Sequence, residues 1–172
     1  MKNKNCGFSL IEISVVIIVI TIIASFAIPS YHQYMAAQEA KKVPKTLTLY
    51  IQKAKHESLL LLFRQNIILC ASTSFKECNN DWNNGYMVFI DKNKNRDYDL
   101  DEPILAFENM QLRYGTLSWR GFGNRRIIFE GNSGLPLSSN GTFQYCSDQY
   151  HNHRKLTLSR MGHPRDEPLA NC

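Results

Sequence analysis

The sequence predicts an α+β protein in which one long N-terminal, membrane-spanning helix packs on an antiparallel β-sheet head domain. Three observations support this prediction. An apolar run occupies residues 8–28, apolar side chains continue beyond it at helical spacing, and from about residue 66 short β-rich runs alternate with turn clusters. The apolar content of 44% and the charged content of 20% are ordinary for a globular protein, which excludes extended disorder.

The net charge of +5 is modest. Lys2 and Lys4 supply two of these charges, and the rest of the chain carries +3 (18 Lys and Arg against 15 Asp and Glu). Affinity for nucleic acid would therefore have to come from a local patch of charge. With the apolar run set aside, the chain has room for one domain of about 110–140 residues with a hydrophobic core.

Residues 8–28 read FSLIEISVVIIVITIIASFAI, and Glu12 is their one charged residue. As a helix, a run of this length extends about 31 Å, enough to cross the core of a bilayer. The preceding lysines predict a cytoplasmic amino end. A cleaved secretory signal would have a shorter apolar core followed by a small-residue site. A simple anchor would not explain Glu12, because a carboxylate in lipid is costly and usually marks a function.

The helix is expected to continue through residues 31–42, and Pro44 is expected to kink or interrupt it. Beyond Pro44, apolar side chains recur at helical spacing and predict a stripe that packs on a sheet: Leu47, Tyr50, Ile51, Ala54, Ser58, Leu61 and Leu62. Runs such as NIILCAS, YMVFID and RIIFEG, separated by Asn, Gly and Ser turns, predict an antiparallel sheet with hairpins. We therefore expect a membrane segment at 8–29, an amphipathic helical continuation at 30–65 and a β-rich head at 66–172.

Four cysteines follow the apolar run: Cys70, Cys78, Cys146 and Cys172. If this part of the chain lies outside the cytoplasm, an even number predicts two disulfides, with three possible connectivities. Short loops favour pairing Cys70 with Cys78 and Cys146 with Cys172. A zinc site is disfavoured, because no CxxC pair or paired His/Cys spacing is present.

No catalytic motif is found: the chain has no nucleophile elbow, P-loop, HExxH or dinucleotide fingerprint, so we expect neither an enzyme nor a cofactor. The segment DKNKNRDYDLDE, residues 91–102, has the spacing of a calcium loop. Asp91, Asn93, Asn95 and Glu102 take positions 1, 3, 5 and 12 of the EF-hand register. Position 6, however, holds Arg96 instead of glycine, and the flanks read as strands. A polar hairpin loop without a metal is therefore the favoured interpretation.

The stretch GFSLIEISVVIIVITIIASFAIPSY resembles the class III signal of type IV pilins and type II secretion pseudopilins. The resemblance implies that a prepilin peptidase removes residues 1–7, including Cys6, by cutting after Gly7. Phe8 would then become the N-methylated terminus, and Glu12 the fifth mature residue. A carboxylate there is costly in lipid until the terminal ammonium of a neighbouring subunit pairs with it, so Glu12 would direct assembly.

The stretches WNNGYMVFIDKNKNRDYDLDEPIL and IIFEGNSGLPLSSNGTFQYC are similar to the GspH/FimT group of minor pilins and pseudopilins. The residues that fit are Trp82, Gly85, Phe89, Asp91, Asn93, Phe129, Gly134, Gly141, Thr142, Phe143 and Cys146. This resemblance implies a type IV pilin fold in a Gram-negative bacterium. It also implies a single pass through the inner membrane, a periplasmic head, and incorporation with major and minor pilins into a cell-surface pilus.

The C-terminal segment HNHRKLTLSRMGHPRDEPLANC is rich in basic residues. In the FimT branch, which serves DNA uptake in natural transformation, this tail carries a Gly-Arg-x-Arg motif that touches DNA. Here it reads Gly162-His163-Pro164-Arg165, and histidine carries less charge than arginine at neutral pH.

The resemblance implies non-specific binding of double-stranded DNA through Arg160, Gly162, His163 and Arg165, with Arg154 and Lys155 also contributing. Arg120, Arg125 and Arg126 form a second basic cluster that either extends this patch or faces water. The alternative is a structural tip-initiation minor pilin, or a secretion pseudopilin, that binds other minor subunits and not DNA.

Overall fold

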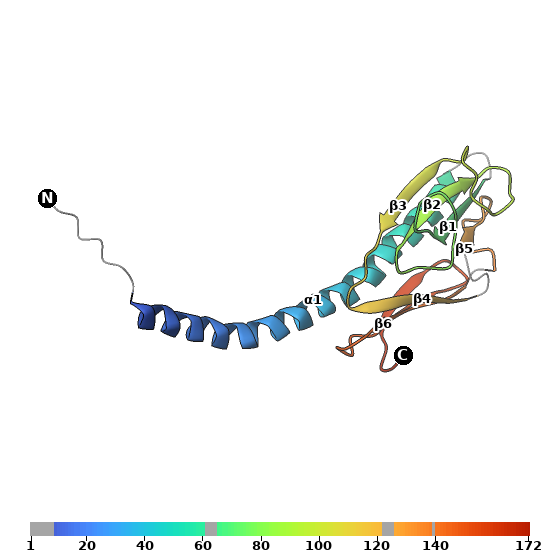
Figure 1. Ribbon diagram of the computed structural model, residues 1–172. Helices are drawn as coiled ribbons and strands as arrows, with labels where there is room; N and C mark the ends of the chain where they lie inside the picture. The colour runs from blue at the N-terminus through green and yellow to red at the C-terminus, as the bar shows by residue number, and fades with distance from the viewer. Residues whose placement is uncertain (1–8, 61–64, 122–125, 139) are drawn as a thin grey trace. The chain divides into compact units, whose positions relative to one another are not determined.

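The computed structural model describes residues 9–60, 65–121, 126–138 and 140–172. Gly7 and Phe8, the predicted cleavage and methylation residues, lie outside this part of the chain, as do Cys6 and Arg125. The chain forms two compact units, Met1–Met35 and Ala36–Cys172, which are described separately. Within the described residues, one helix, α1 (Leu10–Leu60), is followed by eight strands (Figure 1).

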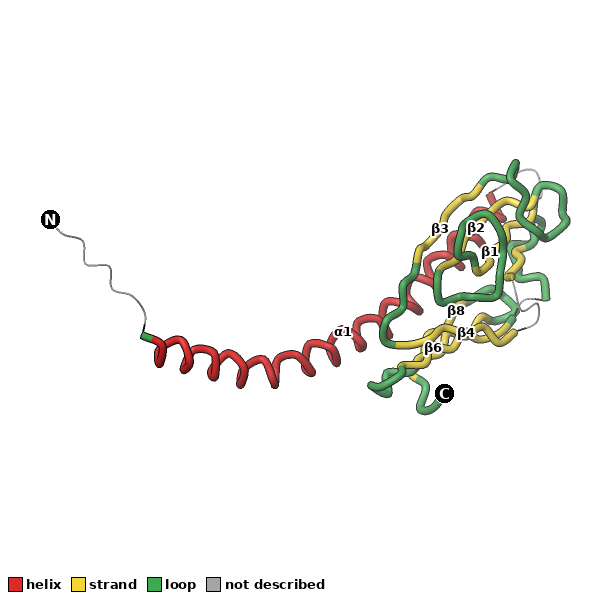
Figure 2. The backbone as a smooth tube through the Cα atoms, in the orientation of Figure 1, coloured by secondary structure: helices red, strands yellow, loops and turns green. Residues whose placement is uncertain are grey.

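The strands form two four-stranded antiparallel sheets. They are β1 (Asn66–Ala71), β2 (Gly85–Asp91), β3 (Ile104–Asn109), β4 (Gly115–Gly121), β5 (Arg126–Phe129), β6 (Gly141–Ser147), β7 (Arg154–Leu158) and β8 (Pro164–Pro168). Sheet A has the order β3-β2-β1-β5, and sheet B has the order β4-β6-β7-β8. Figure 2 shows the two groups of strands, with β1, β2 and β3 apart from β4, β6 and β8. A long helix followed by antiparallel sheets confirms the predicted α+β class.

In the first unit, α1 has an almost wholly apolar surface. An 18-residue window has a mean hydropathy of 2.7 and is 0% buried, so the helix is long and apolar enough to cross a membrane. The hydroxyls of Ser14, Thr21 and Ser25 each donate to the carbonyl three residues earlier, at 2.7–2.8 Å. These polar groups are therefore satisfied inside the helix, which hydrocarbon surroundings require.

Glu12 lies in the first turn of α1. Its Oε2 accepts a hydrogen bond from the N–H of Ser9 at 3.2 Å, and the N–H of Ile13 donates to the Ser9 carbonyl at 3.2 Å. A glutamate that reaches back to the N-cap residue three positions earlier forms half of a capping box. The carboxylate thus satisfies one of the N–H groups that a helix N-terminus leaves unpaired.

The helix continues through Pro29 and Pro44. Pro44 was expected to kink or interrupt the helix, and the structure shows no interruption there. Pro44 is buried in the stripe that meets the sheets, and this packing offsets the missing hydrogen bond. The buried stripe recurs at spacings of one turn and comprises Ala36, Ala40, Val43, Pro44, Leu47, Ile51, Ala54 and Ser58.

The main core of the second unit lies between this stripe and one face of both sheets. Sheet A contributes side chains such as Leu69 and Val88, and sheet B contributes Trp119 and Phe143, all at most 8% exposed. The indole of Trp119 and the ring of Phe143 lie 4.5 Å apart between centroids. Aromatic and β-branched side chains at alternate strand positions therefore build this core, as the β-rich runs predict.

The other face of sheet A has a smaller core that two loops cover. Its strand residues include Met87 and Phe89, and Cys78 and Tyr98 pack on it from the loops. The Tyr98 ring meets Phe89 edge-on, with centroids 5.2 Å apart. The disulfide Cys70–Cys78 closes the first of these loops, and Cys146–Cys172 ties the chain beyond β8 to β6. Both expected disulfides are present, in the connectivity that short loops favour.

A carboxylate of α1 fastens the helix to sheet B. Glu39 Oε1 accepts hydrogen bonds from the hydroxyl of Tyr145 at 2.8 Å and from the N–H of Tyr114 at 3.1 Å. Its Oε2 accepts from the N–H of Arg113 at 3.0 Å. The burial of Tyr145 and its bond to Glu39 raise the pKa of the Tyr145 hydroxyl, which therefore stays a donor at neutral pH.

Candidate nucleic-acid interface

The basic C-terminal segment forms the hairpin β7–β8 at the edge of sheet B. The N–H of Ser159 donates to the His163 carbonyl at 3.1 Å, and the N–H of Gly162 donates to the Ser159 carbonyl at 2.9 Å. Gly162 has a φ of 71°, a left-handed conformation that favours glycine. A Cβ there would also lie 3.2 Å from Pro136 Cδ. The glycine of the predicted motif therefore shapes the turn, and nothing in this geometry requires it to touch a ligand.

The turn is held against α1. Lys55 Nζ donates to the carbonyl of Met161 at 2.8 Å, across 106 residues of sequence. On the other side of the hairpin, the N–H of Leu169 donates to the His153 carbonyl at 3.0 Å, and His153 Nδ1 accepts from the N–H of Ser147 at 3.1 Å. The hairpin is thus fixed at both ends before any ligand binds.

Two of the predicted DNA-binding residues are engaged within the hairpin. Arg154 makes a two-point contact with Asp166, with Nε–Oδ1 at 2.9 Å and Nη2–Oδ2 at 2.5 Å. Lys155 Nζ lies 3.0 Å from Glu167 Oε2. The hydrogen bond and charge of Lys155 lower the pKa of the exposed Glu167 carboxyl, so this pair stays ionised at neutral pH. Asp166 and Glu167 therefore neutralise Arg154 and Lys155.

The remaining predicted residues, Arg160, His163 and Arg165, are exposed. Arg160 and Arg165 form no ion pair with a described residue. The strand register places Arg165 opposite Thr157, Thr157 opposite Thr142, and Thr142 opposite Arg120. Residues in one such cross-strand row share a face of the sheet. Arg120 and Arg165 thus lie at the two ends of one row on the outer face of sheet B.

This row is the last but one at its end of sheet B, and the β7–β8 turn lies just beyond it. The final row joins Gly121, Gly141, Leu158 and Pro164. Arg160 follows Leu158 by two residues, so it lies next to the row that carries Arg120 and Arg165. We call Arg120, Arg160, His163 and Arg165 the basic edge. Neighbouring strands are about 4.8 Å apart, so three strand steps separate Arg120 from Arg165 by roughly 14 Å.

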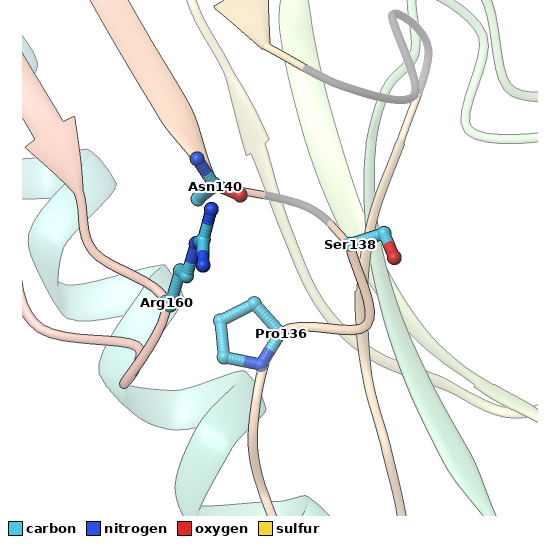
Figure 3. Close-up of a pocket in the computed structure, with 4 residues that line it drawn as sticks. All are labelled: Pro136, Ser138, Asn140 and Arg160. Carbon is cyan, nitrogen blue, oxygen red and sulfur yellow. The ribbon is translucent and has the colours of Figure 1, made fainter.

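Arg160 also lines a hollow of about 630 Å³ together with Pro136, Ser138 and Asn140. Figure 3 shows its guanidinium directed toward the side chain of Asn140, with Pro136 beside it and Ser138 farther away. A cation and an amide at the mouth of an open hollow suit a phosphate or another small anionic group. The hollow thereby extends the basic edge toward the loop between β5 and β6.

The outer face of sheet B is polar. Its described strand residues are Thr116, Ser118, Arg120, Thr142, Gln144, Cys146, Lys155, Thr157, Arg165 and Glu167. Three of them are cationic, and Glu167 alone in this set is anionic, so the face carries a net +2. Sequence reasoning recognised Arg120 as basic but could not place it, since only the register brings it into line with Arg165.

The other predicted site residues lie elsewhere. Arg126, of the second basic cluster, forms an ion pair with Asp97 at 2.5 Å and so faces the 91–102 loop of sheet A. In the described part of the chain, no group of three or more His, Cys, Asp or Glu side chains is arranged to hold a metal ion. The fixed turn, the neutralised pairs and the exposed arginines together form a basic surface at the edge of sheet B.

Comparison with known proteins agrees with this architecture. The family model described as type II transport protein GspH matches residues 45–162, and the model of the prokaryotic N-terminal methylation motif matches residues 2–28. Two proteins of Dichelobacter nodosus, a type IV major fimbrial protein FimA and a fimbrial protein, are each 48% identical over 40 residues. That alignment covers 23% of this chain, and the chain spans about a quarter of the length of these relatives.

No solved structure matches the chain. The GspH model, in contrast, covers well over half of it, including most of the head. The methylation motif covers most of the apolar segment before the head. A long apolar helix joined to antiparallel sheets is the architecture of the type IV pilin fold. The chain therefore belongs to the GspH family of type IV pilin-like proteins, which are structural subunits and not enzymes.

Proposed function

We propose that this protein is a minor pilin that binds double-stranded DNA non-specifically through the basic edge during natural transformation. Residues 1–7 would be removed by the prepilin peptidase, residues 8–29 would span the inner membrane once, and the head would lie in the periplasm until the subunit enters a cell-surface pilus. The observation that carries the proposal is the exposed arginine row of sheet B, with Arg160 beside it.

The geometry favours contact with the phosphate backbone. Arginine pairs with phosphate oxygens through two parallel N–H groups and needs no base edge to do so. The separation of roughly 14 Å between Arg120 and Arg165 is comparable to the width of the DNA major groove, so the two could reach phosphates on either side of it. The row projects from an ordered sheet, so little conformational entropy is lost on binding.

The expected binding is weak and depends strongly on salt. If Arg120, Arg160 and Arg165 each neutralise one phosphate, log K falls against log salt with a slope of about −2.7. Raising the salt from 50 to 200 mM should then weaken binding about 40-fold. Repetition of a weak site along a fibre, or its presentation at the tip, would increase retention by avidity.

The test is fluorescence anisotropy of a labelled 30-base-pair duplex with the full chain in detergent micelles. We expect Arg160→Gln and Arg165→Gln each to reduce the magnitude of the salt slope by about 1. Arg113→Gln is the matched control, because Arg113 is exposed and its removal lowers the net charge equally, but it lies outside the basic edge. Equal loss in all three variants would show that only net charge matters, and no binding at 50 mM salt would reject the proposal.

The assembly part of the proposal rests on Glu12 and the methylation motif. In the structure, Glu12 caps its own helix through Ser9. Removal of residues 1–7 would create a terminal amine on Phe8, the residue directly before Ser9, and the Glu12 carboxylate of a neighbouring subunit could pair with that amine. Mass spectrometry of the protein from its host should find an N-methylated Phe8 terminus. Retention of residues 1–7, or cleavage at another bond, would contradict it.

One observation favours the alternative, a structural minor pilin or pseudopilin that binds other minor subunits. The edge strand β3 exposes Phe107 at 58%, and Phe107 packs on Phe75 with ring centroids 4.8 Å apart beside a hollow of about 450 Å³. An exposed aromatic pair on a sheet edge suits a protein partner. If wild type, but not Phe107→Ser, co-purifies with minor subunits while neither binds DNA, the alternative is correct.

A further inference from the structure

We propose that the DNA-binding surface continues from the basic edge onto one flank of α1, where Lys41 and Lys45 contact the phosphate backbone of the same duplex. This inference rests on the proposed function, because it extends the surface that the basic edge begins. Two observations carry it: a row of cationic and polar side chains along the helix, and a hydrogen bond that joins this row to the β7–β8 turn.

The row follows from helical spacing. Positions four, seven, eleven and fourteen residues after Lys41 lie on the same side of an α-helix as Lys41 itself. These positions hold, in order, Lys45, Thr48, Gln52 and Lys55. We call these five residues the lysine flank. Each of them is exposed or half-buried, so the flank is open to solvent beside the buried stripe of the helix.

No acidic side chain of the helix neutralises the lysine flank. Within residues 36–60, the acidic residues of α1 are Glu39 and Glu57. Each lies two positions from the nearer end of the flank, Glu39 before it and Glu57 after it. Residues two apart do not face each other on a helix, and Glu39 also accepts a hydrogen bond from the Tyr145 hydroxyl. The three lysines of the flank form no ion pair with any residue that the structure describes.

Lys55 joins the lysine flank to the C-terminal hairpin. Its Nζ donates to the Met161 carbonyl at 2.8 Å. Its side chain also passes close to the turn, because a Cβ at Gly162 would lie 3.3 Å from Lys55 Cδ. The turn that carries Arg160 therefore lies against α1 (Figure 3). The lysine flank thus meets the basic edge at this turn, and the two surfaces belong to the same compact unit.

The length of the lysine flank suits a duplex. Lys55 follows Lys41 by 14 residues, so at about 1.5 Å per residue the flank extends about 21 Å. Each strand of B-DNA carries one phosphate per roughly 3.4 Å of helix axis, so a duplex along the flank passes about six base pairs. Lys41 and Lys45 are about 6 Å apart along the helix, which is roughly two phosphate steps of one strand.

Continuity with the basic edge favours DNA over an acidic protein partner. A ligand that reaches both surfaces must extend beyond about 21 Å and must be anionic along its whole length, and a duplex has both properties. Lysine contacts phosphate as a point charge and needs no fixed geometry, so an exposed helical row suits a sequence-independent contact. An acidic face of a neighbouring subunit would bind the flank without requiring the arginines of the basic edge, so variants distinguish the two partners.

The first test repeats the anisotropy titration of the 30-base-pair duplex with the full chain in detergent micelles. Two lysine contacts in addition to three arginine contacts should steepen the slope of log K against log salt from about −2.7 to about −4.5. Lys41→Gln and Lys45→Gln should each reduce its magnitude by about 0.9, and the double variant should return it to about −2.7. Glutamine and lysine have similar helix propensities, so these variants should keep the fold.

Lys76→Gln is the matched control for charge. Lys76 is exposed, and it lies in the loop that the Cys70–Cys78 disulfide closes on the other face of sheet A. This variant lowers the net charge as much as Lys41→Gln does, but it should leave the slope unchanged.

The second test detects contact without changing the charge of the protein beforehand. The full chain is acetylated at its lysines with and without saturating duplex, and peptide mass spectrometry measures the labelling of each lysine. Duplex should reduce the labelling of Lys41 and Lys45 at least about threefold. It should leave unchanged the labelling of Lys76 and of Lys53, whose Nζ donates to the Leu105 carbonyl on the β3 side of the helix.

Unchanged salt slopes in both Lys41→Gln and Lys45→Gln would overturn the inference, as would labelling of these lysines that duplex does not reduce. An equal loss in Lys76→Gln would overturn it too, since only net charge would then matter. If the lysine variants bind DNA normally but no longer co-purify with other pilin subunits, the flank is a subunit interface and the inference is wrong. The proposed function fails separately, when the wild type does not bind DNA at all.

Discussion

Replacing Glu39 by alanine should destabilise the head more than any other single exposed or half-buried change on α1. The carboxylate accepts three hydrogen bonds: from the Tyr145 hydroxyl of β6 and from the N–H groups of Arg113 and Tyr114, which directly precede β4. Tyr145 is 2% exposed, so its hydroxyl would be left buried without an acceptor, at a cost of about 1–3 kcal/mol. The backbone donors are nearer to solvent, and water can replace part of their loss.

The total for Glu39→Ala is therefore about 2–4 kcal/mol, a large fraction of the stability of an ordinary domain. For a chain of this size that corresponds to a fall of about 5–12 °C in melting temperature. Tyr145→Phe should cost only about 1 kcal/mol, because it removes the donor together with the need for an acceptor. The double variant should then be more stable than the sum of the two single effects predicts, by about 1–2 kcal/mol.

The assay is thermal and guanidinium unfolding of the full chain in micelles, with the near-ultraviolet signal of Trp82 and Trp119 as the probe. Gln38→Ala, an exposed neighbour on the same helix, is the control and should change the free energy of unfolding by less than about 0.5 kcal/mol. The reasoning is refuted if Glu39→Ala behaves like this control. Strict additivity in the double variant would show that Glu39 and Tyr145 do not act on each other.

Glu167→Gln should tighten DNA binding about three- to tenfold at 50 mM salt, because it frees Lys155 on the outer face of sheet B from its ion pair. Fluorescence anisotropy measures the affinity, and an unchanged affinity would place the bound DNA away from that face. Cys172→Ser should reduce the free energy of unfolding by about 3.5 kcal/mol, because its disulfide closes a loop of 26 residues, and Cys78→Ser by about 2.5 kcal/mol, because its disulfide closes a loop of 8 residues. Denaturant unfolding measures both changes, and a larger effect of Cys78→Ser would contradict the loop-entropy argument. Stability should fall as the pH rises above about 10. Burial raises the pKa of Tyr145 and Tyr86 in the folded protein, so these hydroxyls lose their protons at lower pH in the unfolded chain than in the folded one. A pH series of melting temperatures that stays flat to pH 11 would exclude this linkage.

The sequence was sufficient for the elements that depend on local pattern. The apolar run, the helical stripe that includes Leu47 and Ile51, and the β-rich runs each have a period that identifies the element and its buried face. Loop length favoured the disulfide connectivity that the structure shows, but the sequence left three connectivities open. The helix is not interrupted at Pro44, because packing buries its ring, and local propensity does not show this packing.

Contacts between distant segments could not be predicted. Nothing in the sequence signals that Glu39 reaches Tyr145, 106 residues away, or that Arg120 shares a row with Arg165. The basic tail was recognised from composition, but the pairing of Arg154 with Asp166 depends on strand register. The spacing of a calcium loop at residues 91–102 was recognised from the sequence and set aside because of Arg96. The left-handed backbone of Arg96 and the burial of Asp91 could not be read from that spacing.

The cross-strand row has a thermodynamic consequence. DNA docking on the outer face of sheet B would bring together charged and hydroxyl-bearing groups, and it would cover little hydrocarbon surface. The heat capacity change of association should therefore be close to zero, and the measured enthalpy should hardly vary between 10 and 35 °C. Released counterions would supply a favourable entropy instead. A calorimetric signature of this kind would distinguish a preformed electrostatic platform from a tail that folds around its ligand.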